Sequence, residues 1–403
     1  MSTSIVYHQH GVREIRFLSF HPENGAGVFT VELKGDFVCC PVCGSRKVVS
    51  RGGVERVFKS LPVGKKPTFI VMRVPRVECA KCGVVRQVAV PFADERGRLT
   101  HSLERYVADL CRHMTMQAVA EHLGLRWETV RDVQRDWLAR KFRRPKLKHL
   151  RQLGVDEIAV GKGHKYLTVV LDLKTGVVVF VGEGKGADAL EPFWRKLKAA
   201  KAKIEVVSMD MSQAFVSAVS KNLPEAMIVF DHFHVMKLAN HAVDKVRRRV
   251  TRKASDEAKA DIKGKRWLLL KNYDNLDSAK KEPESLDDLM AAQAELAFTY
   301  LMKEQLRDFW KLKDVNDAKT FLAEWLASAA DSGIPELKTL AETLAKHEIG
   351  LLSRWLFPVS NGIVEGTNNK IKTMTRQAYG FRDKEFLKLK IMAIHLAEYE
   401  LVG

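Results

Sequence analysis

The sequence predicts a mixed α/β protein, in which a small cysteine-bearing domain and a short helical domain precede an α/β domain with a long helical insertion. Two C-x-x-C pairs lie among alternating apolar and polar residues, a pattern typical of short strands. A helical periodicity then runs from residue 102 to about residue 142. From residue 152 short apolar runs alternate with helical segments, and residues 234–354 have an almost unbroken helical pattern.

The chain is strongly basic. Its 403 residues include 67 Lys and Arg against 49 Asp and Glu, and residues 1–150 alone carry 27 basic and 14 acidic side chains. A positive field of this size attracts polyanions, and duplex DNA is the densest common one. Since no apolar stretch has the length of a membrane span and the N-terminus lacks a signal-peptide pattern, we expect a cytoplasmic, nucleoid-associated protein with no membrane partner.

Four of the six cysteines form two pairs with metal-ligand spacing. The pairs are Cys40-Pro-Val-Cys43-Gly and Cys79-Ala-Lys-Cys82-Gly, each followed by a glycine that allows a tight turn. Four converging thiolates suit one tetrahedral ion, so we expect a structural Zn²⁺ at Cys40, Cys43, Cys79 and Cys82. Cys39 leaves the choice of its neighbour Cys40 open, and Cys111 is expected to be core. The alternative is two unrelated pairs of reduced cysteines.

Residues 115–137 predict a helix-turn-helix. Val119, Ala120 and Leu123 point inward on the first helix, Gly124 makes the turn, and Val130, Val133 and Trp137 point inward on the second. This pattern leaves polar side chains exposed that can enter a major groove, and we expect DNA contacts from Arg126, Thr129, Arg131 and Arg135. The alternative is a helical hairpin within a bundle, but the basic surroundings favour DNA.

Residues 152–231 predict three strands, then a helix, a strand, a helix and a last strand. The expected strands are 153–160, 166–172, 177–181, 204–210 and 227–231, and the expected helices are 189–201 and 212–222. Three strands joined as hairpins, followed by alternating helix and strand, is the order of the ribonuclease-H-like fold. In this topology the first and fourth strands are neighbours.

Three acids are placed where a metal site can form. Asp156 lies within the first strand and Asp210 closes the fourth, and an acid in an apolar strand is costly to bury unless it is paired or binds a cation. Glu365 begins a predicted helix on which Asn361, Glu365, Asn368 and Asn369 share one face. Two Mg²⁺ or Mn²⁺ ions held by such carboxylates can activate the nucleophile and stabilise the leaving oxygen at a phosphodiester.

Other acids compete for this role. Strand alternation points Glu157 away from Asp156, and Asp172 lies at a strand end beside a turn. Asp231 and His234 follow the fifth strand and could position a phosphate or a flanking strand. The alternative for each acid, taken alone, is a helix cap or a salt bridge.

The ordered set of motifs resembles the ISL3 family of bacterial insertion-sequence transposases. After the cysteine pairs and the helix-turn-helix, the matching segments are Gly154-Val-Asp-Glu-Ile-Ala-Val-Gly-Lys-Gly-His-Lys-Tyr166, Val207-Ser-Met-Asp-Met-Ser212, Val229-Phe-Asp-His-Phe-His-Val235 and Asn361-Gly-Ile-Val-Glu-Gly-Thr-Asn-Asn-Lys370. The resemblance implies a DDE transposase with a ribonuclease-H-like core, with Asp156, Asp210 and Glu365 as catalytic metal ligands. Asp231-x-x-His234 matches a supporting motif of related families, and Asn368 and Lys370 are expected to contact DNA.

We therefore expect a transposase that binds the terminal inverted repeats of a mobile element and acts as a homodimer or higher oligomer on element ends and target DNA. The expected segments are a zinc-binding domain (1–95), a helix-turn-helix domain with a basic linker (96–150), the first part of an α/β ribonuclease-H-like core (151–234), an all-α insertion (235–355) and the rest of the core (356–403). The alternatives are a non-enzymatic DNA-binding regulator, an RNA-guided nuclease and an inactive domesticated transposase.

Overall fold

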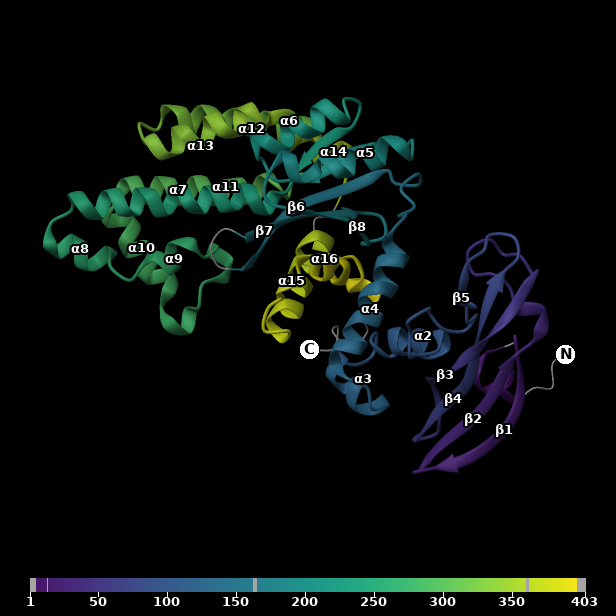
Figure 1. The fold of residues 1–403 in the computed structure, drawn as a ribbon. Helices are drawn as coiled ribbons and strands as arrows, with labels where there is room; N and C mark the ends of the chain where they lie inside the picture. Colours follow the sequence, from purple (N-terminus) through teal and green to yellow (C-terminus); the bar gives the residue numbers. More distant parts are fainter. Residues whose placement is uncertain (1–4, 13, 162–164, 360–361, 397–403) are drawn as a thin grey trace. The chain divides into compact units, whose positions relative to one another are not determined.

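The computed structural model describes residues 5–12, 14–161, 165–359 and 362–396. The chain divides into two compact units (Figure 1). The first contains residues 1–144 together with 385–403, and the second contains residues 145–384. Within the described residues, no helix is both long enough and apolar enough to cross a membrane.

A five-stranded sheet forms the body of the first unit. Its order is β1-β2-β4-β3, with β5 paired to β4, and only the β2–β4 pair is parallel. The bounds are α1 (Ile5–His10), β1 (Ile15–Glu23), β2 (Ala26–Leu33), β3 (Val48–Val63), β4 (Lys66–Cys79) and β5 (Val85–Gln87). Phe58, Ile70 and Met72 are fully buried, so the long β3–β4 hairpin carries the centre of this core.

Three helices of the first unit follow the sheet. They are α2 (His101–Leu110), α3 (Met116–Leu123) and α4 (Trp127–Phe142). A further helix, α16 (Lys384–Met392), lies near the C-terminus of the chain. The hydroxyls of Thr100 and Thr115 cap α2 and α3 by accepting hydrogen bonds from N–H groups of their first turns. Backbone hydrogen bonds from Lys59 to Arg98, and from Thr100 back to Lys59, join β3 to the segment that leads into α2.

The sheet of the second unit has the order β10-β9-β6-β7-β8. Its strands are β6 (Gln152–Gly161), β7 (Lys165–Asp172), β8 (Val178–Glu183), β9 (Val206–Met209) and β10 (Met227–Phe230). β6, β7 and β8 pair antiparallel, whereas β9 is parallel to β6 and β10 is parallel to β9. All five strands lie within two residues of the bounds expected from the sequence. Val170, Leu171 and Asp172 at the end of β7 are almost fully buried, because β7 lies between β6 and β8 in the sheet.

Helices α5 (Glu191–Ala199) and α6 (Gln213–Asn222) connect these strands, and a helical region follows β10. Its helices are α7 (His232–Lys253), α8 (Asp256–Ile262), α9 (Arg266–Leu270), α10 (Glu282–Ala292), α11 (Ala294–Phe309), α12 (Val315–Asp331), α13 (Pro335–Lys346) and α14 (Glu348–Leu356). α7 and α11 run side by side (Figure 1). One apolar core extends from Leu147 through the sheet to Leu351, so the helical region and the sheet fold as one body.

Helix α15 (Gly362–Gln377) packs against β6 at a glycine. Residues alternate between the two faces of β6: Leu153 and Val155 join the apolar core, whereas Gly154 meets Val364 of α15. A Cβ atom at Gly154 would lie 2.7 Å from Cγ2 of Val364 and 2.8 Å from Cδ2 of Leu173. The missing side chain therefore sets how closely α15 approaches the strand.

We predict that Gly154→Ala forces α15 away from β6 and lowers the free energy of unfolding by about 1–3 kcal/mol, as overpacked cores do. Urea unfolding of the full chain measures the effect. Gly366→Ala is the matched control, because nothing lies within 4 Å of its added Cβ and alanine favours a helix. Equal stability of the two variants would contradict the close packing at Gly154.

Candidate active site and nucleic-acid interface

The register of three parallel strands brings three acids to one edge of the sheet. Gly154 pairs with Ser208 between β6 and β9, and two residues further along each strand lie Asp156 and Asp210. Phe230 pairs with Met209 between β10 and β9, so Asp231 follows beside Asp210. We call Asp156, Asp210 and Asp231 the carboxylate cluster. Asp156 shares the face of β6 that meets α15, because it lies two residues from Gly154.

Both carboxylate oxygens of Asp156 have partners. Oδ1 accepts a hydrogen bond from the backbone N–H of Glu157 (2.7 Å), and Oδ2 accepts one from Nδ2 of Asn368 (2.6 Å). Asn368 is buried on α15, 212 residues away in the sequence. Burial raises the pKa of Asp156 above its usual value, and the Glu157 N–H opposes that effect. The carboxylate is thus fixed in position and electrostatically receptive to a cation.

The other two acids of the cluster begin helices. Asp210 Oδ1 accepts from the N–H of Ser212 (3.0 Å), directly before α6, and Asp231 Oδ1 accepts from the N–H of Phe233 (3.0 Å) as the N-cap of α7. Nδ1 of His234 lies 3.4 Å from Oδ2 of Asp231. This contact raises the pKa of His234, and the negative charges of Asp156 and Asp210 raise it further. These contacts favour the protonated form of the His234 imidazole beside the carboxylate cluster.

The remaining acids lie apart from the cluster. Glu365 is exposed in the first turn of α15, one turn before Asn368. Among the described residues, neither Glu365 nor Asp231 forms a group with Asp156 and Asp210 whose ligand atoms all lie within 4.8 Å of one another. Glu157 accepts a hydrogen bond from the N–H of Gly186, and Asp172 caps the turn after β7 through Lys174 and Thr175. Asn361, expected on the Glu365 face, lies outside the described residues.

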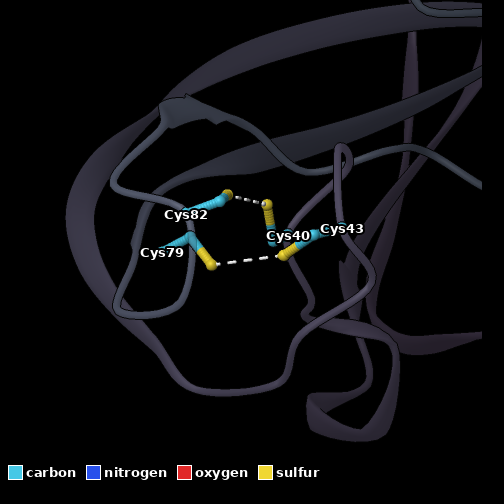
Figure 2. Close-up of side chains that lie close together, drawn as sticks. All are labelled: Cys40, Cys43, Cys79 and Cys82. Atoms are coloured by element: carbon cyan, nitrogen blue, oxygen red, sulfur yellow. Dashed lines mark hydrogen bonds between the residues drawn. The ribbon is translucent and has the colours of Figure 1, made fainter.

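The four thiols of the two C-x-x-C pairs face one another from two loops (Figure 2). Sγ of Cys40 lies 3.6 Å from Sγ of Cys82, and Sγ of Cys43 lies 3.5 Å from Sγ of Cys79. Zn–S bonds of about 2.3 Å in a tetrahedron require sulfur–sulfur separations near ~3.8 Å, so the arrangement fits zinc. Backbone N–H groups of Cys43 and Val42 lower the pKa of the Cys40 thiol, which favours the thiolate that binds metal.

The two loops have the same construction. The N–H of Gly44 donates to the carbonyl of Cys40, the N–H of Gly83 donates to the carbonyl of Cys79, and both glycines have φ near 70°. Glycine reaches this left-handed backbone conformation without a steric penalty. Cys39 is outside the group of four, and Cys111 is buried in the core of α2, α3 and α4. The spacing of each pair with its glycine was therefore enough to identify the cluster.

The turn between α3 and α4 is held by a lysine from the sheet. Gly124 ends α3 in the left-handed conformation with φ of 57°. Nζ of Lys59, on β3, donates hydrogen bonds to the carbonyls of Leu123 (2.7 Å) and Gly124 (2.8 Å), and burial lowers its pKa. These carbonyls are the unpaired acceptors at the end of a helix, so the ammonium caps α3 and fixes the turn to the sheet.

A basic cavity of about 850 Å³ lies beside this turn. Its lining includes Arg56, Lys59, Arg96, Arg98 and Arg126. Arg126 is exposed at the start of α4, where its side chain makes no capping hydrogen bond, so the first N–H groups of the helix add to the positive potential. We call this surface the basic cavity.

The expected recognition face of α4 is only partly free. Val130 is buried as expected, but Trp137 is half-buried and Leu138 is the buried residue at that end. Arg131 donates to Asp132 (2.8 Å) and lies over the ring of Trp127, and Arg135 donates to Asp136 (3.3 Å). Such surface ion pairs are weak, about 0–1 kcal/mol, so both guanidinium groups can exchange them for DNA.

Three family models match the chain. A transposase model covers residues 153–391, a model of the helix-turn-helix domain of transposase family ISL3 covers residues 88–138, and a model of the zinc finger of the IS204, IS1001, IS1096 and IS1165 transposases covers residues 36–82. The chain belongs to the ISL3 family of transposases. It is thus a transposase, an enzyme class that cleaves and transfers DNA strands, as the motifs predicted.

Two sequence relatives agree with the family assignment. The transposase is 33% identical to the transposase for insertion sequence element IS1001 of Bordetella parapertussis, over 92% of this chain and 93% of that protein. It is 30% identical to the transposase for IS1557 of Mycobacterium tuberculosis, over 86% and 83%. The Drosophila P element transposase strand transfer complex matches with a TM-score of 0.38 and 12% identity, over 74% of this chain and 93% of that one.

Two features of this transposase were missed from the sequence. Asn368 was expected to contact DNA, and the structure adds that its side chain is buried and donates a hydrogen bond to Asp156, because α15 packs on β6. Lys59 was not singled out, although it joins the sheet to the helix-turn-helix. Both contacts link residues far apart in the sequence, and no local pattern marks them.

We predict that the purified transposase carries about one zinc ion per chain and that Cys79→Ser combined with Cys82→Ser removes it, because two of four ligands are lost. Elemental analysis of the folded protein measures the content. Cys39→Ser and Cys111→Ser are the matched controls and should leave the zinc content unchanged. Zinc retained by the double variant would show that the metal is bound elsewhere.

Proposed function

We propose that this transposase cuts and joins DNA at divalent metal ions held by Asp156, Asp210 and Glu365. The proposal rests on one observation, the β6–β9 register that carries Asp156 and Asp210 to the same edge and face of the sheet. Glu365 lies on α15, the helix that packs on this face through Gly154 and Asn368. The sheet order supports a ribonuclease-H-like core for residues 151–234 and 356–403.

The donor set fits hard cations, because Mg²⁺ and Mn²⁺ prefer carboxylate oxygens. Two such ions, when bound, supply an activated oxygen nucleophile and stabilise the leaving oxygen at phosphorus. The side chains have separate tasks. Asn368 orients the Asp156 carboxylate through its 2.6 Å hydrogen bond, and His234, held by Asp231, presents a positive charge to a phosphate beside the site. Lys370, five residues after Glu365 on α15, contacts the DNA backbone.

The first unit recognises the element ends. In this proposal Arg126, Thr129, Arg131 and Arg135 of α4 read bases of the terminal inverted repeats, while the basic cavity holds the phosphate backbone beside them. A zinc ion at the four thiols keeps the β3–β4 hairpin closed at one end. Paired ends require two copies of the protein, so the active form is a homodimer or higher oligomer, which acts at the nucleoid in the cytoplasm on element and target DNA.

The domain bounds of this proposal are those expected from the sequence. Residues 1–95 bind zinc, residues 96–150 carry the helix-turn-helix and the basic linker, and residues 235–355 form the helical insertion within the core. The insertion begins inside the site, since Asp231 caps α7.

We predict that Asp156→Asn, Asp210→Asn and Glu365→Gln each lower strand cleavage and joining by several orders of magnitude in Mg²⁺ or Mn²⁺, because each keeps the shape but removes a ligand charge. Cleavage of a labelled element end measures the loss, while zinc content and end binding stay near normal. Asp172→Asn is the control, since its turn-capping oxygen is retained.

The outcomes separate the alternatives. Complete loss in Asp231→Asn would point to Asp231 as a ligand in place of Asp210. Near-normal activity of Glu365→Gln would show that another acid is the third metal ligand. If all three substitutions are silent, the metal proposal is wrong and a DNA-binding regulator remains.

We predict that Arg131→Ala combined with Arg135→Ala weakens binding of the cognate end more than binding of random duplex DNA, because base contacts carry specificity. Arg126→Ala should weaken both and reduce the salt dependence, because it faces the basic cavity. Fluorescence anisotropy at several salt concentrations measures both effects. Equal losses on the two DNAs for the Arg131 and Arg135 variant would make these residues phosphate contacts.

A further inference from the structure

A cleft of about 640 Å³ extends along the insertion helix α7 and reaches Asp210 of the carboxylate cluster. Asp210 and His234 line the end near the cluster, and Arg248 of α7 and Arg266 of α9 line the other. His234, Leu238, His241 and Arg248 recur at helical spacing on one face of α7. From His234 to Arg248 the helix rises about 21 Å at ~1.5 Å per residue, so the cleft is a track that starts at the candidate active site.

A buried acid organises the far end of this cleft. Asp244 is 5% exposed and contacts three guanidinium groups, those of Arg247 (2.8 Å), Arg248 (2.6 Å) and Arg266 (3.3 Å). One negative charge is therefore surrounded by three positive ones. Arg248 and Arg266 remain 56% and 45% exposed, so each can still bind an anion from the cleft side while Asp244 fixes its orientation.

An exposed aromatic side chain lies directly beside Arg266. Trp267 is 68% exposed, and the guanidinium of Arg266 lies 4.8 Å from the centre of its ring. Stacking on a flat group covers an indole ring that is otherwise exposed to water. A DNA base has a π-face that can stack in this way. The lining of the cleft also includes the apolar side chains of Met211, Leu238 and Leu270.

We infer that this cleft and Trp267 bind an unpaired DNA segment that continues from the phosphate at the carboxylate cluster. Arg248 and Arg266 hold its phosphates, and Trp267 stacks on a base, the combination of basic groove and aromatic platform that suits single strands. The apolar lining favours the exposed faces of unpaired bases over duplex DNA, which buries its bases and presents phosphates outward.

This inference rests on the proposed function for the position of the scissile phosphate, but its test needs no cleavage. The full-length transposase is titrated, without added Mg²⁺, into a blunt duplex and into the same duplex with a short single-stranded extension. We expect wild type to prefer the extended DNA by about tenfold. Trp267→Ala, and Arg248→Ala combined with Arg266→Ala, should remove the preference and leave blunt-duplex binding unchanged.

Two controls define the result. Trp267→Phe should retain most of the preference because phenylalanine also stacks, and Lys319→Ala removes an exposed positive charge on α12 and should change neither affinity. Thermal unfolding confirms that each variant is folded.

An unchanged preference in Trp267→Ala and in the arginine variant would overturn the inference. Equal losses on both DNAs would assign the cleft to duplex DNA, and a change of oligomeric state without a change of preference would assign Trp267 to a protein interface. Asp156→Asn separates the two proposals. If this variant loses cleavage but keeps the preference for extended DNA, the cleavage assay tests the metal site and the binding assay tests the cleft independently.

Discussion

The hydrogen bond between Asn368 and Asp156 is the contact on which the candidate active site depends. A carboxylate within a buried strand is stable only with a partner or a cation, and Asn368 provides the side-chain partner. Its reach requires α15 to lie close to β6, which the missing side chain of Gly154 permits. Glu365 lies on the same helix, exposed in its first turn. One small residue thus permits both the packing of α15 on β6 and the hydrogen bond that orients Asp156.

The first helix of the insertion, α7, is capped by a residue of the carboxylate cluster. Asp231 is the next residue after β10 and at the same time the N-cap of α7, so the cluster and the insertion share a side chain. α7 then extends away from the cluster with one face lining the cleft. Because one apolar core spans the sheet and the insertion, α7 is a rigid extension of the sheet edge.

Local patterns in the sequence predicted most of the architecture, and contacts between distant residues account for what was missed. The C-x-x-C spacing located the four thiols, and apolar runs located all five strands of the second sheet, because both signals lie within a few residues. The adjacency of Asp156 and Asp210 followed from strand order alone. The burial of Asn368, the role of Lys59 and the ion pairs of Arg131 with Asp132 depend on packing or on rotamers, which periodicity does not encode. The catalytic assignments of Asp156, Asp210 and Glu365 remain predictions.

The span of 212 residues between Asp156 and Asn368 has a consequence for synthesis of the protein. A ribosome adds about 5–20 residues per second, so β6 emerges roughly 10–40 s before its partner on α15 exists. During that interval the sheet edge has its strands but Asp156 has only a backbone partner. The sheet and helix-turn-helix of residues 1–144 are by then outside the ribosome. The helices α2, α3 and α4 are therefore synthesised well before the partner of Asp156, and a chain released before residue 368 lacks the side chain that orients Asp156.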